Sequence, residues 1–126
     1  MSKGVTLLEM LVVLAVTAMV VGVTAPAVVS MLDARREAAA LAVMRDHIAS
    51  LPWLARNAGK SMVFGERSEA SERLPMPEDW TISWTRPLHV NRRGMCSDAK
   101  AMLQTPRRTL ELTIAGPYCE TIDNAR

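Results

Sequence analysis

The distribution of hydrophobic and polar residues divides the chain into two stretches of different character. Residues 10–32 follow one another without a single charged side chain. A helix of that length spans about 34 Å at about 1.5 Å per residue, which is enough for a bilayer core of about 30 Å. From Asp33 onward the chain carries charges throughout. The pattern therefore predicts an apolar helical stem followed by a globular part.

The helix is expected to continue beyond the apolar run, because residues 34–51 are rich in helix-forming side chains. One apolar face repeats there at helical spacing, and it consists of Leu41, Met44, Ile48 and Leu51. Pro52 is expected to end or bend this helix, with at most a further turn over residues 53–55 before Asn57 and Gly59 stop it.

Alternation of apolar and polar residues predicts strands in the remainder of the chain. The predicted strands are residues 61–65, 80–85, 88–90 and 108–115. Residues 66–79 are polar and contain prolines, so a surface loop is expected there, and Pro106 with Arg107 predicts a turn into the last strand. A long helix packed on a small antiparallel sheet, an α+β fold, is the expected result.

Composition adds little to this picture. A chain of 126 residues allows one modest domain with an appendage, and the formal net charge is only +2. The arginines stand singly or in pairs, which is typical of a solvated surface rather than a nucleic-acid interface. No nucleic-acid partner is therefore predicted.

The chain shows no pattern that indicates catalysis. His47 and His89 belong to no recognisable motif, and there is no glycine-rich phosphate loop, carboxylate pair or nucleophile elbow. We expect no catalytic residue, no cofactor, no metal and no enzymatic activity. Trp53, Trp80 and Trp84 are interpreted as core or subunit contacts rather than a base-stacking platform.

One acidic residue, Glu9, stands at the edge of the apolar run. Three functions are considered for the N-terminal segment, and they differ in whether they explain this residue. A secretory signal peptide would use Lys3 as its positive residue and the A-x-A pattern of residues 25–27 as its cleavage site. The apolar run is too long for such a signal, and it continues beyond this cleavage site. A plain transmembrane anchor explains the length and keeps Lys3 cytoplasmic. It leaves Glu9 unexplained, although a charge entering hydrocarbon costs about 3 kcal/mol or more.

The third explanation is a resemblance. Residues 3–9, KGVTLLE, resemble the class III signal of type IV prepilins and type II secretion pseudopilins. This implies that a prepilin peptidase cleaves after Gly4 and methylates the new terminus at Val5, although the family usually has Phe there. It also implies that Glu9 neutralises the terminal amine of an adjacent subunit. The alternative is that the Glu9 carboxylate lies in the lipid headgroup region and has no function.

Two residues interrupt the predicted stem helix. Gly22 weakens it and Pro26 removes one backbone hydrogen bond, so local bending or melting is expected. Pro26 also falls where the resembled family commonly has a helix-bending proline. A simple kink of a membrane helix remains the alternative.

The resemblance implies a division of the chain into four segments. Residues 1–4 would be the leader and residues 5–32 the transmembrane and assembly helix. Residues 33–58 would continue the helix in the periplasm, and residues 59–126 would form a β-rich periplasmic part.

Cys96 and Cys119 are the only cysteines, and both fall in the part expected outside the inner membrane. A disulfide is therefore predicted, and closing a loop of about 24 residues would contribute about 3 kcal/mol. Two reduced thiols remain the alternative, and a zinc pair is disfavoured because neither cysteine is part of a CxxC motif. The cysteine positions also resemble the cysteine-closed C-terminal region of pilins and several minor pseudopilins.

The resemblance finally implies a function. The short globular part and the single cysteine pair resemble the H-type minor pseudopilins of type II secretion systems. Such a protein is a single-pass inner-membrane protein with a cytoplasmic N-terminus. Its partners would be major and minor pseudopilins, the prepilin peptidase and the inner-membrane secretion platform. A minor pilin of a type IV pilus or DNA-uptake machine is the alternative.

Overall fold

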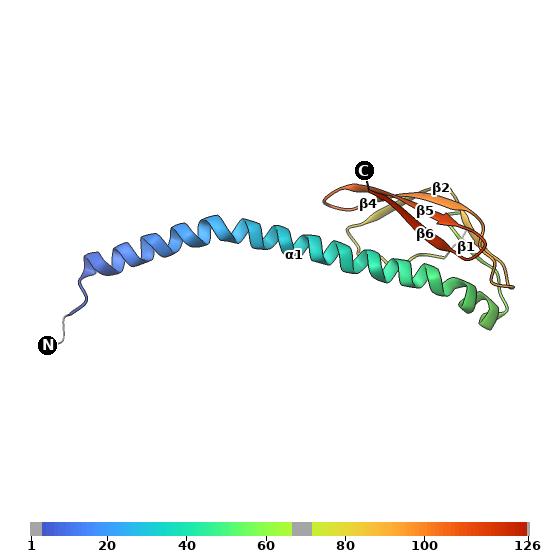
Figure 1. The fold of residues 1–126 in the computed structure, drawn as a ribbon, viewed down its shortest axis with the longest axis horizontal. Coiled ribbons are helices and arrows are strands. Elements are labelled where there is room, and N and C mark those ends of the chain that lie inside the picture. Colours follow the sequence, from blue (N-terminus) through green and yellow to red (C-terminus); the bar gives the residue numbers. More distant parts are fainter. Residues whose placement is uncertain (1–3, 67–71, 126) are drawn as a thin grey trace. The chain divides into compact units, whose positions relative to one another are not determined.

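The computed structural model describes residues 4–66 and 72–125. It contains two compact units, Met1–Glu37 (unit 1) and Ala38–Arg126 (unit 2). The described part of unit 1 is helical from residue 7 onward, and unit 2 contains the rest of this helix and the strands (Figure 1).

The helix α1 extends over Leu7–Ala58 without interruption. It ends where expected, because Gly59 has a φ of 63° and a glycine readily adopts this left-handed conformation after the last helical residue. Of the two effects expected of Pro52, the end of the helix does not occur, and a bend there remains a prediction. Leu51 and Ala55, on either side of the proline, are both fully buried, and this packing holds the helix together across the missing backbone hydrogen bond.

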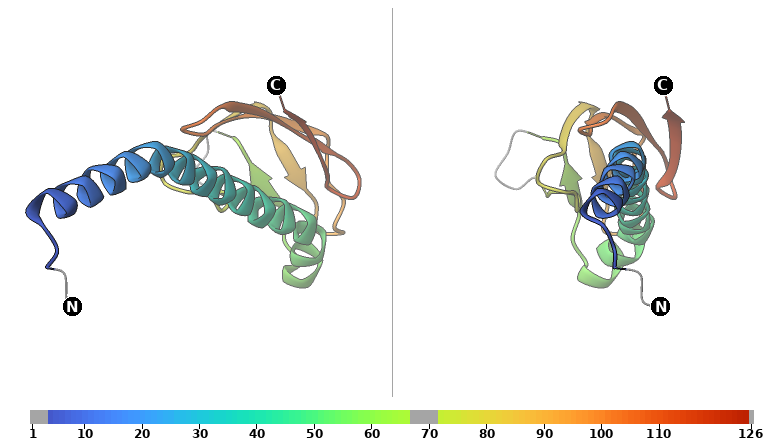
Figure 2. Two further views of the ribbon diagram at one scale, coloured as in Figure 1. Left: turned by 60° about the vertical axis from the view of Figure 1, so that its left-hand side comes forward. Right: turned by 90° about the vertical axis from the view of Figure 1, so that its left-hand side faces the viewer.

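The strands of unit 2 form two antiparallel sheets. The strands are β1 (Met62–Phe64), β2 (Thr81–Arg86), β3 (Leu88–Val90), β4 (Ala99–Gln104), β5 (Thr109–Ala115) and β6 (Glu120–Ala125). The larger sheet has the order β2-β4-β5-β6, and β1 pairs with β3 in a smaller sheet. In unit 2, α1 lies along one face of the larger sheet (Figure 2).

The core of unit 2 lies between this part of α1 and the inner faces of the sheets. The predicted helix face is confirmed, with Met44, Ile48 and Leu51 buried and Leu41 packed against them. Strands β4 and β5 alternate strictly, so that Leu103, Leu112 and their alternate neighbours point inward. This is the α+β, pilin-like arrangement that the sequence predicts.

The strand predictions are confirmed for β1, β2, β3 and β5, whereas β4 and β6 were not predicted. The turn at Pro106 is also confirmed, since the Thr105 hydroxyl accepts hydrogen bonds from the Arg107 and Arg108 amides at 3.3 and 3.1 Å.

The predicted surface loop at residues 66–79 needs a correction. Residues 67–71 lie outside the described residues, but Leu74 is buried and Met76 packs against the core. The Glu72 amide also donates a 2.8 Å hydrogen bond to the Val63 carbonyl. The segment is therefore partly a cover of the core, because its two apolar side chains outweigh its polar composition.

The predicted disulfide between Cys96 and Cys119 is present, with the two Cα atoms 5.4 Å apart. The Cys96 amide also donates a 2.9 Å hydrogen bond to the Pro117 carbonyl. The segment before β4 is thus joined to the turn between β5 and β6 by a covalent bond and a hydrogen bond.

Candidate assembly site at the N-terminus

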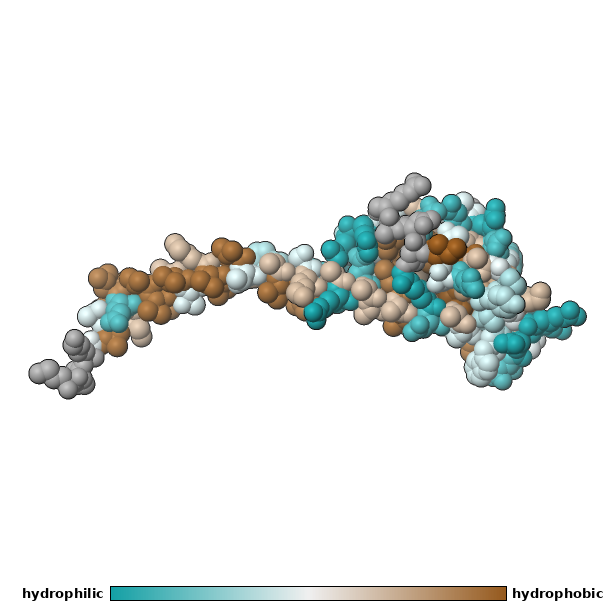
Figure 3. All heavy atoms as spheres, in the orientation of Figure 1, coloured by the Kyte–Doolittle hydropathy of each residue, from teal (hydrophilic) through white to brown (hydrophobic). Residues whose placement is uncertain are grey.

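The first part of α1 presents apolar side chains on all sides. The large hydrophobic residues from Val5 to Leu32 are each about half exposed or more, and hydrophobic spheres cover this segment in Figure 3. By length and composition the helix is able to cross a membrane. A helix that is apolar all round requires an apolar environment, either lipid or other helices.

The two threonine hydroxyls inside this apolar run are satisfied by the helix itself. The Thr17 hydroxyl donates to the Val13 carbonyl at 2.7 Å, and the Thr24 hydroxyl donates to the Val20 carbonyl at 2.9 Å. Neither hydroxyl therefore needs water, and both are compatible with hydrocarbon.

The helix begins with a specific cap formed by Thr6. Its hydroxyl accepts a 3.2 Å hydrogen bond from the Glu9 amide, and its carbonyl accepts one of 3.2 Å from the Met10 amide. Thr6 is thus the N-cap and Glu9 is the third helical residue, as in a T-x-x-E capping box. The sequence analysis did not identify Thr6, although this spacing was visible in it.

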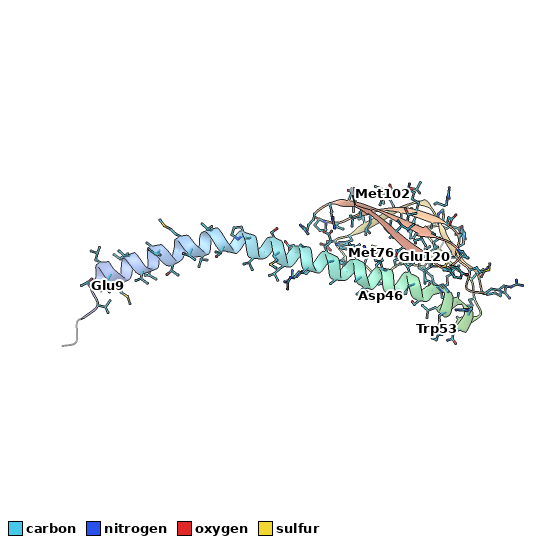
Figure 4. All side chains as sticks on the ribbon, viewed as in Figure 1. Glu9, Asp46, Trp53, Met76, Met102 and Glu120 are labelled. Carbon is cyan, nitrogen blue, oxygen red and sulfur yellow. A yellow bond between two sulfur atoms is a disulfide. The ribbon has the colours of Figure 1, made fainter. Side chains whose placement is uncertain are left out.

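The carboxylate of Glu9 has no hydrogen bond or ion pair with the residues that the structure describes, 4–66 and 72–125. The side chain is exposed at the start of α1 (Figure 4). Its position in the first turn places it in the favourable field of the helix N-terminus, worth about 0.3–1 kcal/mol. The reciprocal half of a capping box, from the carboxylate back to the Thr6 amide, is not formed, so the carboxylate is available to another group.

The proposed processing point lies immediately before the cap. Residues 4–6 precede the helix, and the Val5 side chain is exposed. A Cβ added at Gly4 would meet no atom within 4 Å. The peptide bond between Gly4 and Val5 is therefore accessible, whereas Lys3 lies outside the described residues.

The two predicted bend residues are both helical. α1 is unbroken across Gly22 and Pro26, so the structure shows no melted segment there. A bend at these positions remains a prediction.

Residues 1–25 match the family model of the prokaryotic N-terminal methylation motif. The motif indicates a type IV pilin-like prepilin. It implies processing by a prepilin peptidase and assembly with other pilins, and the apolar helix is compatible with the single-pass anchor of such proteins. Searches of curated proteins and of solved structures gave no match.

The remaining candidates from the sequence lie in unit 2 and are not brought together. His89 is exposed and lies 3.4 Å from the Glu66 carboxylate, while His47 is half-buried on α1. Trp80 is buried and Trp84 packs against the core, as expected. In the part of the chain that the structure describes, no group of three or more His, Cys, Asp or Glu side chains is placed to hold a metal ion.

Proposed function

We propose that this chain is a structural subunit of a pilus-like fibre, namely a minor pseudopilin of a type II secretion system. The observation that carries the proposal is the Glu9 carboxylate. It lies at the mouth of an exposed apolar helix, five positions after Gly4, and has no partner among the described residues. Cleavage after Gly4 would create a positive amine on Val5, which supplies the missing partner from an adjacent subunit.

The physical basis of this pairing is the low dielectric of the fibre interior. A carboxylate and an ammonium attract each other strongly there, and either one alone is costly. A new subunit would therefore be stabilised at the axial position where its Glu9 meets the amine of its neighbour. The single charge pair fixes a register that apolar packing alone would leave undefined.

Two features of unit 2 support the assignment as a minor pseudopilin. Its globular part is short, and a disulfide closes its C-terminal region. Both features resemble the H-type minor pseudopilins. The alternative is a minor pilin of a type IV pilus or DNA-uptake machine, which uses the same N-terminal signal. Deletion of the gene separates the two, because the first function predicts a secretion defect and the second a twitching or DNA-uptake defect.

The orientation in the membrane is part of the same proposal. Lys3 before the apolar run favours a cytoplasmic N-terminus. The disulfide between Cys96 and Cys119 favours an oxidising compartment for unit 2, which is the periplasm of a secretion system. The chain would thus be an inner-membrane protein before assembly and a part of the pseudopilus afterwards.

We further propose that the chain has no catalytic role and needs no cofactor. The force for secretion would come from an ATPase that acts through the inner-membrane platform. This chain would contribute only its contacts with the platform and with the other pseudopilins.

The test is the mass of the mature N-terminus. We expect mass spectrometry of the full chain from its native membrane to show a first residue Val5 that carries a methyl group. Gly4→Val should abolish this product without affecting the fold, because a Cβ at Gly4 meets no neighbouring atom.

The matched control for this test is Gly22→Ala, a second glycine with open space around its Cα. It should leave processing unchanged. A mature chain that still begins at Met1, or one that begins at Val28, would refute the proposed function.

A further inference from the structure

The proposed processing point lies just outside the hydrogen-bonded part of α1. The helix begins at Leu7, and the described residues before it are not helical (Figure 1). Among the described residues, the helical hydrogen bonds start with the Thr6 carbonyl, which accepts from the Met10 amide at 3.2 Å. The carbonyls of Gly4 and Val5 accept no hydrogen bond from the described part of the chain. The carbonyl of the bond to be cleaved, that of Gly4, is therefore open.

A single side chain keeps the helix from extending over this bond. To include Val5 in the helix, the Glu9 amide would have to donate to the Val5 carbonyl, because α-helical hydrogen bonds join residues four positions apart. The Glu9 amide instead donates to the Thr6 hydroxyl at 3.2 Å. The cap thus occupies the donor that helix extension needs. The next hydrogen bond back, from the Leu8 amide to the Gly4 carbonyl, would depend on that same turn being formed.

Threonine has a different role further along α1. The Thr17 and Thr24 hydroxyls donate to carbonyls four residues earlier, at 2.7 and 2.9 Å. They occupy no backbone amide, so the helix continues through them. The Thr6 hydroxyl accepts from an amide, which is the defining contact of an N-cap. Position at the start of the helix, and not the residue type alone, gives Thr6 its effect.

The surroundings of the cap increase its effect. Glu9 stands at the edge of the uncharged run of residues 10–32. Near hydrocarbon there is little water to satisfy a backbone amide that has lost its partner, so such an amide is costly there. Without the Thr6 hydroxyl, the Glu9 amide would therefore be satisfied by the Val5 carbonyl, and the helix would grow toward the bond to be cleaved.

We propose that Thr6 is a positioning residue for the processing reaction. Its cap presents the peptide bond between Gly4 and Val5 to the prepilin peptidase as open, non-helical backbone. The peptidase adds one water molecule across this bond, so that Gly4 leaves with a carboxylate and Val5 keeps the nitrogen as an amine. Proteolysis follows the population of the open form of the substrate, and the cap raises that population. This step rests on the proposed function, because it takes the bond between Gly4 and Val5 as the processing point.

Replacement of the hydroxyl by a methyl group tests the cap. Thr6→Val keeps the shape of the side chain but removes the acceptor. Loss of an N-cap lowers the population of the open form by about five-fold, so the rate of cleavage should fall by about the same factor. Pulse labelling of the full chain in its native membrane measures this rate, as the conversion of the precursor to the chain that begins at Val5.

Matched variants show whether the cap or the hydroxyl itself is needed. Thr6→Ser and Thr6→Asn both supply an N-cap oxygen, but asparagine has no hydroxyl. Both should be cleaved at the wild-type rate. Thr17→Val makes the same chemical change inside α1, where the hydroxyl only donates to the Val13 carbonyl, so it should leave the rate unchanged. Rescue by serine alone would mean that the peptidase binds the hydroxyl, and it would overturn the proposal.

A spectroscopic measurement follows the helix directly. The carbon-13 chemical shifts of Val5, in the uncleaved full chain in detergent, should move toward helical values in Thr6→Val and stay at wild-type values in Thr6→Asn. An unchanged shift in Thr6→Val, or an unchanged rate of cleavage, would refute the role of Thr6 and leave the proposed function intact. If the wild-type chain itself is never cleaved before Val5, the proposed function is refuted, and this inference with it.

Discussion

At the scale of single residues, the energetics of Glu9 decide whether it needs a partner. Its own helix N-terminus contributes about 0.3–1 kcal/mol, and the Thr6 cap uses only the Glu9 amide, at 3.2 Å. Moving the carboxylate into hydrocarbon costs about 3 kcal/mol or more. If the carboxylate enters hydrocarbon, the chain alone therefore does not offset the cost, and in the proposed assembly the positive group comes from an adjacent subunit.

The Glu9→Gln substitution tests this requirement. Glutamine preserves size and hydrogen bonding but removes the charge, which leaves the amine of the neighbouring subunit unpaired. The loss of one partner of a buried ion pair costs about 3–5 kcal/mol, so incorporation into the fibre should fall more than about a hundred-fold. The incorporation is measured by quantitative blotting, as the ratio of this protein in isolated fibres to this protein in the membrane.

The matched control for this substitution is Asp33→Asn, at the other end of the apolar run. It also removes one exposed carboxylate from α1, but no partner is assigned to that carboxylate. Incorporation should remain at the wild-type level. Full incorporation of the Glu9→Gln chain would mean that this acid is idle.

At the scale of elements, the sequence predicts those strands whose residues carry their own signal. β5 alternates leucine and isoleucine with polar residues, so it is recognisable by itself. β4 contains Ala99, Lys100 and Ala101, and both alanine and lysine have low strand propensity. It forms because β2 and β5 pair with it on both sides. β6 is likewise determined by its pairing with β5.

The same distinction applies to the assembly site. Gly4, Val5 and Glu9 are recognisable from their spacing alone, because the signal is local. That the Glu9 carboxylate has no partner among the described residues is a property of the folded chain, and the sequence does not reveal it. The continuation of α1 past Pro52 also depends on the tertiary packing of the residues on either side of the proline. Helix propensities describe single residues and do not include such packing.

The contact between β1 and β2 provides a prediction at this scale. Gly65, directly after β1, has a φ of 89°, and an added Cβ would overlap three atoms of the Trp84 indole on β2. Gly65→Ala should therefore combine backbone strain with overpacking and destabilise unit 2 by about 2–4 kcal/mol. Chemical denaturation of the full chain in detergent measures the change.

Gly59→Ala is the control for Gly65→Ala, because Gly59 has a φ of 63° but no atom within 4 Å of its added Cβ. It should cost only the backbone term of about 1–2 kcal/mol. If the two alanine variants were equally stable, the indole would not constrain the position of β1.

At the scale of the whole molecule, the two units are stabilised in different ways. In its described residues, unit 1 exposes its large apolar side chains and forms no core of its own, so it depends on lipid or on neighbouring helices. Unit 2 has a core but is small, and small domains commonly need an additional covalent constraint. The disulfide between Cys96 and Cys119 provides this constraint.

The double variant Cys96→Ala/Cys119→Ala separates the two units experimentally. The cysteines are 23 positions apart, and loss of this closed loop should cost unit 2 about 3 kcal/mol, which corresponds to a midpoint lower by about 10–20 °C. Because the apolar half of α1 is stabilised by the detergent micelle rather than by the disulfide, its helical circular-dichroism signal should persist while the tryptophan fluorescence of unit 2 changes. If the helical circular-dichroism signal and the tryptophan fluorescence changed together, the independence of the two units would be refuted. If the midpoint also stayed at that of the unmodified protein, the stabilising role of the disulfide would be refuted too.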